Sequence, residues 1–145
     1  MEYRPFTLED LPRTAKLYVD YYNAYEDGEG TIETTTKRIH QVMTREDAFG
    51  LLLEDKGRLL GFAMGYFEQY DDCQAYDLIE IVVAGERQNQ GLGTAFMREL
   101  ERRVREKGAM LIQLQSVNDA KHEHFYDKLG FKDAKNLVLK TKMLG

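Results

Sequence analysis

The feature that most constrains the fold is a strand, a glycine turn and a helix in immediate succession. An apolar run ends at Val83, a polar loop with two glycines follows, and a helical pattern begins at Leu92. Apolar side chains fall on both faces of the run, which predicts a central strand of a sheet; the expected faces are Leu78 with Val82, and Ile79 with Ile81 and Val83. Such a turn presents backbone N–H groups at a helix N-terminus, where they favour anions.

The order of elements along the rest of the chain predicts the fold class. Apolar runs bounded by turn residues predict strands over residues 3–6, 49–53, 59–67, 75–83, 110–117 and 137–143. Apolar residues at three- and four-residue steps predict helices from Asp10 to about residue 26, over 31–44, from the glycine turn to Gly108, and over 119–128. This order is typical of an α/β domain with a mixed, largely antiparallel central sheet and flanking helices. Residues 1–145 are expected to form a single domain.

Charge and cysteine content narrow the class of partners. The net charge of −5 differs from the basic surface that a nucleic acid requires; it fits a cationic substrate loosely, and also ordinary solubility. Cys73 is the only cysteine and has no intramolecular disulfide partner, which favours a reducing compartment. Neither a leader pattern nor a membrane-length apolar run is present. A cytoplasmic protein with no nucleic-acid or membrane partner is therefore expected.

The glycine turn is a candidate anion site. It is not a P-loop, because no Lys-Ser/Thr pair follows the glycines, and it lacks the third glycine of a dinucleotide fingerprint. The loop residues Gln88, Asn89 and Gln90 are uncharged donors, and Gly91 and Gly93 follow them. Together they predict a rigid ledge of N–H groups suited to a pyrophosphate. A tight structural loop is the alternative.

Glu80 is the candidate for acid–base chemistry. A carboxylate within a central strand costs several kcal/mol unless it is paired, hydrated or protonated. One interpretation is a structural salt bridge or an exposed edge. The other is a general base that takes a proton from an amine, because perturbed carboxylates concentrate in active sites.

Aromatic and acidic residues supply further candidates. Tyr22, Tyr25 and Glu26, at the end of the first helix, form either an ordinary helix face with a solvated loop or a wall for a cationic amine. Tyr126 either packs with its hydroxyl at a surface or donates a proton to a leaving thiolate. The histidines and the cysteine lack the spacing of a metal site, so none is predicted.

Two motifs, in the right order, resemble those of the GNAT superfamily of N-acetyltransferases over nearly the whole chain. The first is Gln/Arg-x-x-Gly-x-Gly/Ala after an apolar strand, and residues 88–93 read Gln-Asn-Gln-Gly-Leu-Gly. The second is an asparagine followed by Phe-Tyr-x-x-x-Gly-Phe; Asn118 precedes Phe-Tyr-Asp-Lys-Leu-Gly-Phe over 125–131. The first helix and the strand over 76–83 are similar to the aminoglycoside 6′-N-acetyltransferase-like branch. That branch often has a tryptophan after the first helix and this chain has none, so aminoglycosides are not carried over as the substrate.

The resemblance implies acetyl-CoA as the acetyl donor. In the family, the strand matching 81–83 splays from the strand matching 111–115, and its backbone pairs with the pantetheine arm. Glu80 falls where many relatives carry a catalytic or substrate-orienting acid, and Tyr126 falls on the tyrosine that protonates the CoA sulfur. The implied cofactor-binding residues are Ile81, Val82, Val83, Gln88, Asn89, Gln90, Gly91, Leu92, Gly93, Thr94, Asn118 and Tyr126.

These observations lead to one main hypothesis: direct acetyl transfer to a primary amine, through a tetrahedral intermediate, with a small cationic amine as acceptor. Tyr22, Tyr25, Glu26 and Glu80 are the candidate substrate-binding residues. A protein lysine or N-terminus is the alternative acceptor, and an acetyl-CoA-binding sensor without turnover is the alternative function. A homodimer is also considered, because the alternating segment over 137–143 is suited to pairing across a sheet edge.

Overall fold

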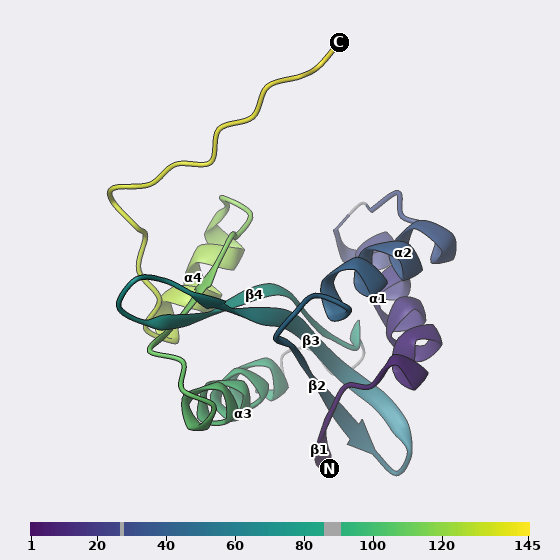
Figure 1. Cartoon of the computed structure of the whole chain (residues 1–145). Coiled ribbons are helices and arrows are strands. Elements are labelled where there is room, and N and C mark those ends of the chain that lie inside the picture. Colours follow the sequence, from purple (N-terminus) through teal and green to yellow (C-terminus); the bar gives the residue numbers. More distant parts are fainter. Residues whose placement is uncertain (27, 86–90) are drawn as a thin grey trace. The chain divides into compact units, whose positions relative to one another are not determined.

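The structure, a computed structural model, describes residues 1–26, 28–85 and 91–145 (Figure 1). The chain divides into two compact units, Met1–Leu114 and Gln115–Gly145. The first unit contains the sheet and three of the α-helices, and the second contains one helix and the C-terminal segment. The expectation of a single domain stays a prediction.

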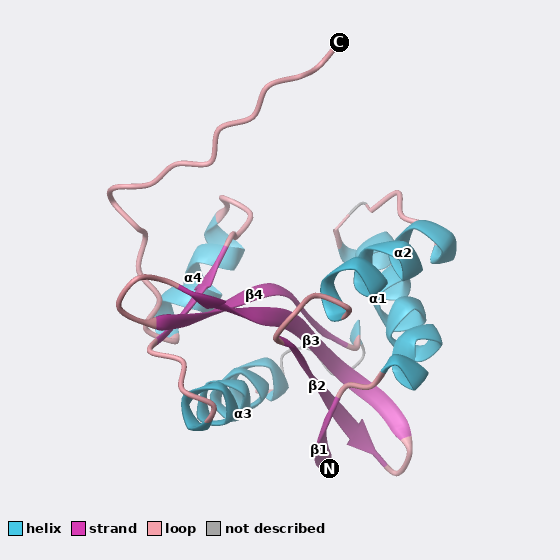
Figure 2. Ribbon diagram, in the orientation of Figure 1, coloured by secondary structure: helices cyan, strands magenta, loops and turns pink. Residues whose placement is uncertain are grey.

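The first unit is built on a five-stranded sheet of order β1-β2-β3-β4-β5 (Figure 2). Its neighbouring strands pair antiparallel, except that β4 and β5 are parallel. This mixed, largely antiparallel sheet confirms the predicted fold class. The strands are β1 (Glu2–Pro5), β2 (Ala48–Asp55), β3 (Arg58–Gln69), β4 (Gln74–Val83) and β5 (Leu111–Leu114).

Helices cover both faces of this sheet. The helices of the first unit are α1 (Leu11–Tyr25), which follows a 3-10 turn η1 (Leu8–Asp10), α2 (Ile32–Met43) and α3 (Leu92–Glu106). On one face, Ala15 of α1 and Ile39 of α2 pack with Phe62 and Met64 of β3 in a buried cluster. On the other face, the Phe96 ring of α3 lies directly over Gly61, which has no room for a side chain. No helix of the described residues is long and apolar enough to cross a bilayer.

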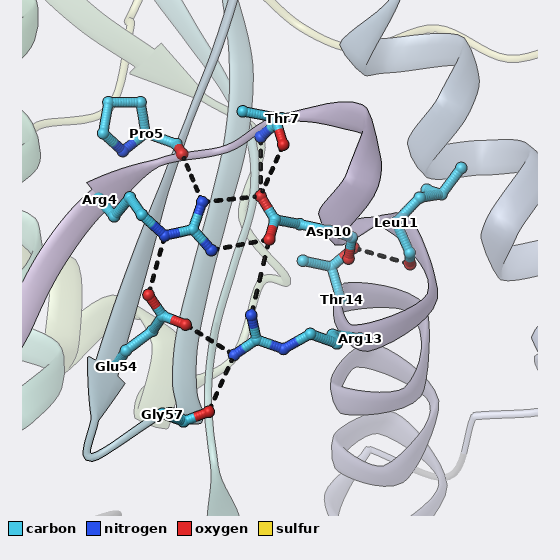
Figure 3. A network of polar contacts seen from close by, with 9 residues as sticks. All are labelled: Arg4, Pro5, Thr7, Asp10, Leu11, Arg13, Thr14, Glu54 and Gly57. Carbon is cyan, nitrogen blue, oxygen red and sulfur yellow. Dashed lines mark hydrogen bonds and ion pairs between the residues drawn. The ribbon is translucent and has the colours of Figure 1, made fainter.

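A polar network fixes the start of α1 against the sheet (Figure 3). The α1 helix begins after Asp10, as predicted, but the Asp10 side chain does not cap it. The carboxylate accepts bonds from Arg4 (2.7 and 3.1 Å) and from the Thr7 backbone N–H (2.8 Å). Arg4 also donates to Glu54 of β2 at 2.9 Å, and Arg13 of α1 donates to the same carboxylate at 2.7 Å. The network therefore joins β1, β2 and α1 through charge-assisted bonds.

We expect Asp10→Asn to lower the free energy of unfolding near neutral pH by about 1.5–3 kcal/mol, the range for hydrogen bonds to charged groups. Burial of Asp10 acts to raise its pKa, but the bonds from Arg4 and Thr7 outweigh burial, so the pKa lies below its usual value. The stabilising effect is therefore complete above about pH 4, near the pKa of an unfolded aspartate, and is lost as the pH falls further.

Denaturant unfolding at several pH values checks this prediction. Between pH 6 and 3, the stability of Asp10→Asn should fall less steeply than that of the unchanged protein. The control is Asp20→Asn, which removes an exposed i,i+4 pair with Lys16 and should cost under about 1 kcal/mol. Equal acid sensitivity with and without Asp10 would contradict the prediction.

The second unit contains α4 (Ala120–Lys128), whose N-cap Asp119 accepts a bond from the His122 backbone N–H at 2.8 Å. The strand predicted over Leu137–Met143 is wrong: these residues form no strand, and Leu137, Leu139 and Met143 are exposed. Alternation of apolar and polar residues specifies a strand only where a sheet edge receives it, and no described strand pairs with this segment. Pairing with a second copy, as in the expected homodimer, stays a prediction.

Candidate active site

A β-bulge in β4 determines which face Glu80 occupies. Along β3, Met64 pairs with Glu80 and the next residue, Gly65, pairs with Leu78, so Ile79 is an extra residue in β4. Ile79 packs against the cluster formed by α1, α2 and β3. Glu80 contacts side chains of the same two helices. Two consecutive residues of β4 therefore face the same side, which regular alternation does not allow.

The bulge corrects the faces expected from the sequence. Residues opposite one another in an antiparallel pair lie on the same face, so Leu78 shares the face of Gly65. The predictions that Leu78 shares a face with Val82, and Ile79 with Ile81 and Val83, are wrong, because the extra residue shifts the alternation by one. A glycine is required at position 65, since a Cβ there would overlap the carbonyl oxygen of Asp77.

Within the part of the chain that the structure describes, three donors hold the Glu80 carboxylate. The Tyr22 hydroxyl donates to Oε2 at 2.5 Å, and the Tyr18 hydroxyl donates to Oε1 at 3.1 Å. The Arg38 guanidinium of α2 also donates to Oε1, at 3.1 Å. A carboxylate has about four acceptor positions, so these donors leave about one for a substrate or a water. The Glu80 side chain is 15% exposed, which makes it accessible but largely screened by its neighbours.

Electrostatics keep these donors protonated. Burial and then the negative charge of Glu80 raise the pKa of Tyr22 well above its usual value. The same two causes raise the pKa of Tyr18. Burial acts to lower the pKa of Arg38, but its contacts with Tyr18 and Glu80 raise it above the usual value. At neutral pH the described donors to Glu80 are therefore one guanidinium and two neutral phenols.

Beyond the bulge, one edge of β4 pairs with no strand of the described residues. Pairing of β4 with β5 ends at Leu78. The Ala84 N–H donates to Leu60 of β3 at 2.7 Å, and backbone groups of successive residues point to opposite sides of a strand. The N–H and C=O groups of Ile81 and Val83 therefore point away from β3, and no described strand pairs with them. Val82 lies between them and directs its backbone groups toward β3.

The N-terminus of α3 presents three more N–H groups. Gly91 is the N-cap, with a left-handed φ of 75°, and no described side chain caps the helix. The first intrahelical bond runs from Ala95 N–H to the Gly91 carbonyl oxygen at 3.1 Å. The N–H groups of Leu92, Gly93 and Thr94 therefore have no acceptor within the helix, which is the arrangement that binds anions. The other residues predicted to form the pyrophosphate site are Gln88, Asn89 and Gln90, and they lie outside the described residues.

The two other predicted substrate-binding residues, Tyr25 and Glu26, lie at the C-terminal end of α1. Tyr25 lies over Gly85, just beyond β4, and its ring occupies the space that a Cβ at Gly85 would need. Glu26 accepts a bond from the Tyr21 hydroxyl at 3.1 Å and does not contact Glu80. Of the predicted substrate residues, the structure brings only Tyr22 onto the Glu80 carboxylate.

Two of the predicted site residues, Tyr126 and Asn118, belong to the second unit. The Tyr126 ring, on α4, is half-buried and packs edge-on against Phe125 and Phe131, with centroids 5.1 and 5.6 Å away. Asn118 is exposed in the segment before α4.

Sequence reasoning missed Arg38 as part of the site. A single arginine within a helical pattern does not by itself predict a functional site. Its position, four residues before the buried Val42, predicts only that it lies on the helix. The signal that points to a cation is Glu80 itself, because a carboxylate in a central strand needs a partner of opposite charge. Among the described residues, no group of three or more His, Cys, Asp or Glu side chains is arranged to hold a metal.

Comparison with known proteins identifies the family. A model described as "Acetyltransferase (GNAT) family" matches residues 11–131, most of the chain. The chain belongs to the GNAT family of acetyltransferases. An uncharacterized protein of Bacillus subtilis, YxbD, is 31% identical over 87 residues; this match spans 59% of the chain and 50% of YxbD.

Solved structures share this GNAT fold. One is an aminoglycoside acetyltransferase from an uncultured soil metagenomic sample in complex with sisomicin, 15% identical, with a TM-score of 0.79 over 99% of this chain and 96% of that one. Another is an aminoglycoside N-acetyltransferase, AAC(6′)-Iy, in complex with CoA; it is 13% identical, with a TM-score of 0.76 over 97% of this chain and 93% of that one. At these identities the likeness shows a shared fold. The family assignment confirms the resemblance drawn from the two motifs.

Proposed function

We propose that this GNAT protein transfers the acetyl group of acetyl-CoA directly to the primary amine of a small molecule. The observation that carries the proposal is the position of Glu80. The β4 bulge directs this partly exposed carboxylate toward α1 and α2, beside the edge of β4 with which no described strand pairs. A carboxylate that is accessible, oriented by three donors and left with an acceptor position is suited to receive a proton from an ammonium.

The free edge of β4 and the N-terminus of α3 fit acetyl-CoA. The outward N–H and C=O groups of Ile81 and Val83 match the amide groups of a pantetheine arm, which need hydrogen-bond partners of this kind. The N–H groups of Leu92, Gly93 and Thr94 favour the negative charge of a pyrophosphate. The AAC(6′)-Iy complex with CoA supports this assignment.

The reaction forms a bond between the acceptor nitrogen and the acetyl carbonyl carbon and breaks the bond between that carbon and sulfur. The ammonium gives up two protons in total. Glu80, directly or through a water, accepts the proton that frees the amine for attack, and passes it to solvent. Tyr126 is the proposed donor of a proton to the departing thiolate, and the second proton from the nitrogen restores the Tyr126 hydroxyl. A backbone N–H of the β4 edge stabilises the negative oxygen that develops on the carbonyl.

Two alternatives are separated by experiment. The acceptor is taken to be small because one solved relative of the same fold is in complex with sisomicin. A protein lysine or N-terminus as acceptor, and a sensor that binds acetyl-CoA without turnover, are the alternatives.

Release of the CoA thiol from acetyl-CoA, measured against small amines, amino acids and lysine peptides, tests the proposal. Turnover with a small primary amine is the expected result. Turnover with peptides alone would replace the small acceptor with a protein. A rise in melting temperature with acetyl-CoA, but no release with any amine, would support the sensor instead.

We expect Gly91→Leu to weaken acetyl-CoA binding at least about tenfold, or about 1.4 kcal/mol, by placing a side chain where the pyrophosphate would approach. Gly57, in the β2–β3 turn, gives a matched control. Both glycines have a left-handed φ, 75° at Gly91 and 82° at Gly57, and neither would place a Cβ within 4 Å of another group. The backbone strain of the two substitutions is therefore similar. Calorimetry should show a loss of acetyl-CoA affinity for Gly91→Leu and not for Gly57→Leu. Equal affinities in both variants would contradict the proposed pyrophosphate site at the N-terminus of α3.

A further inference from the structure

The charges around Glu80 do not suit a simple polycation. Among the described residues, the charged side chains that contact each other in this site are one carboxylate and one guanidinium, and their charges cancel. Tyr18 and Tyr22 are the other described donors to Glu80 and are neutral while protonated. An ammonium that binds at Glu80 therefore arrives next to a positive charge. A second positive group on the acceptor would add to this repulsion.

Arg38 has donors to spare for an anionic group. Its Nη2 donates to Glu80, whereas a guanidinium carries five N–H donors in a planar fork. The side chain is 48% exposed, so part of this fork faces solvent. A fork of this kind matches the two oxygens of a carboxylate better than a single point charge would.

We propose that the acceptor is a zwitterion whose primary amine lies at Glu80 and whose carboxylate, a few bonds away, pairs with Arg38. The chemical class is a free amino acid or a similar amino carboxylate. This inference rests on the proposed acetyl transfer to a small amine and specifies which amine. It replaces the purely cationic acceptor expected from the sequence, because each charge of a zwitterion then meets the opposite charge in the site.

Matched acceptors test the inference. Each free amino acid is compared with the amine that lacks its carboxylate, such as phenylalanine with phenethylamine and alanine with ethylamine, and with the amino acid amide. In the unchanged protein, kcat/KM for the carboxylate-bearing member should be at least about tenfold higher. In Arg38→Gln this ratio should approach one, mainly through a higher KM. Arg38→Lys, which keeps the charge but not the fork, should retain part of the preference.

Arg98 provides the control, because it is an exposed arginine on α3 that pairs with Glu101. Arg98→Gln should leave the ratio unchanged, and melting temperatures should show that all variants are folded. The inference is overturned if the amine lacking a carboxylate is the better acceptor, or if Arg38→Gln lowers every rate equally and leaves the ratio as it was. In either case the acetyl transfer itself stands. If no primary amine of the panel is acetylated, the proposed function fails, and the inference fails with it.

Discussion

Glu80→Gln should lower kcat by about 10²–10⁴-fold, the range for a general base, while acetyl-CoA binding persists. The amide keeps the shape of the side chain but cannot accept the proton of an ammonium. Its NH2 group would also face donors, since Tyr18, Tyr22 and Arg38 all donate to this side chain. Some loss of stability is therefore expected, and the melting temperature separates it from the loss of rate.

The pH profile distinguishes a base from a structural carboxylate. An amine that solution has already deprotonated needs no base, so the deficit of Glu80→Gln should shrink as the pH rises toward the pKa of the free acceptor amine. Glu101→Gln on α3 is the matched control and should retain full activity at every pH. An unchanged kcat in Glu80→Gln, or a deficit that is the same at every pH, would remove Glu80 from proton transfer.

Tyr126→Phe should lower kcat by about 10²-fold and leave the affinity for the amine unchanged, because the hydroxyl is proposed to protonate the departing thiolate. The Tyr126 ring packs edge-on against Phe125 and Phe131, and phenylalanine preserves these ring contacts. The variant is therefore expected to fold, and its loss of rate reports on the hydroxyl.

A second test of Tyr126 changes the thiol that leaves from the acetyl donor. A thioester donor with a more acidic thiol needs less help from an acid, so the deficit of Tyr126→Phe should narrow with such a donor. Tyr3→Phe on β1 is the control, since Tyr3 packs on Phe96 of α3 and should tolerate the loss of its hydroxyl. A change in amine KM without a change in kcat would assign Tyr126 a packing role.

Sequence patterns predicted the elements whose signals are local. Apolar residues at three- and four-residue steps predicted α1, and two apolar runs bounded by turn residues predicted β2 and β3. The glycine turn predicted the N-terminus of α3, because the left-handed backbone at Gly91 suits glycine. Each of these depends on residues that are neighbours in the sequence.

The parts that were missed depend on pairing or on distant residues. The β4 bulge is defined by the register against β3, which no single strand specifies. Arg38 joins the site because α2 packs against α1 and β3, which brings this side chain to Glu80, 42 positions away in the sequence. The segment Leu137–Met143 has the alternation of a strand, but alternation does not supply the neighbouring edge that a strand needs.

The bulge at Ile79 makes β4 two short strands in opposite phase, joined at one residue. Removal of that residue would bring the two strands into one phase, because Leu78 opposite Gly65 and Glu80 opposite Met64 would then be neighbours in regular alternation. Glu80 would then keep its face, and the protein would lose only the packing of Ile79 against the cluster formed by α1, α2 and β3, together with the local bend that a bulge gives a strand. Evolution of the acceptor preference can therefore proceed through substitutions around Glu80, and the length of β4 can change by the one bulged residue without turning the carboxylate to the other face.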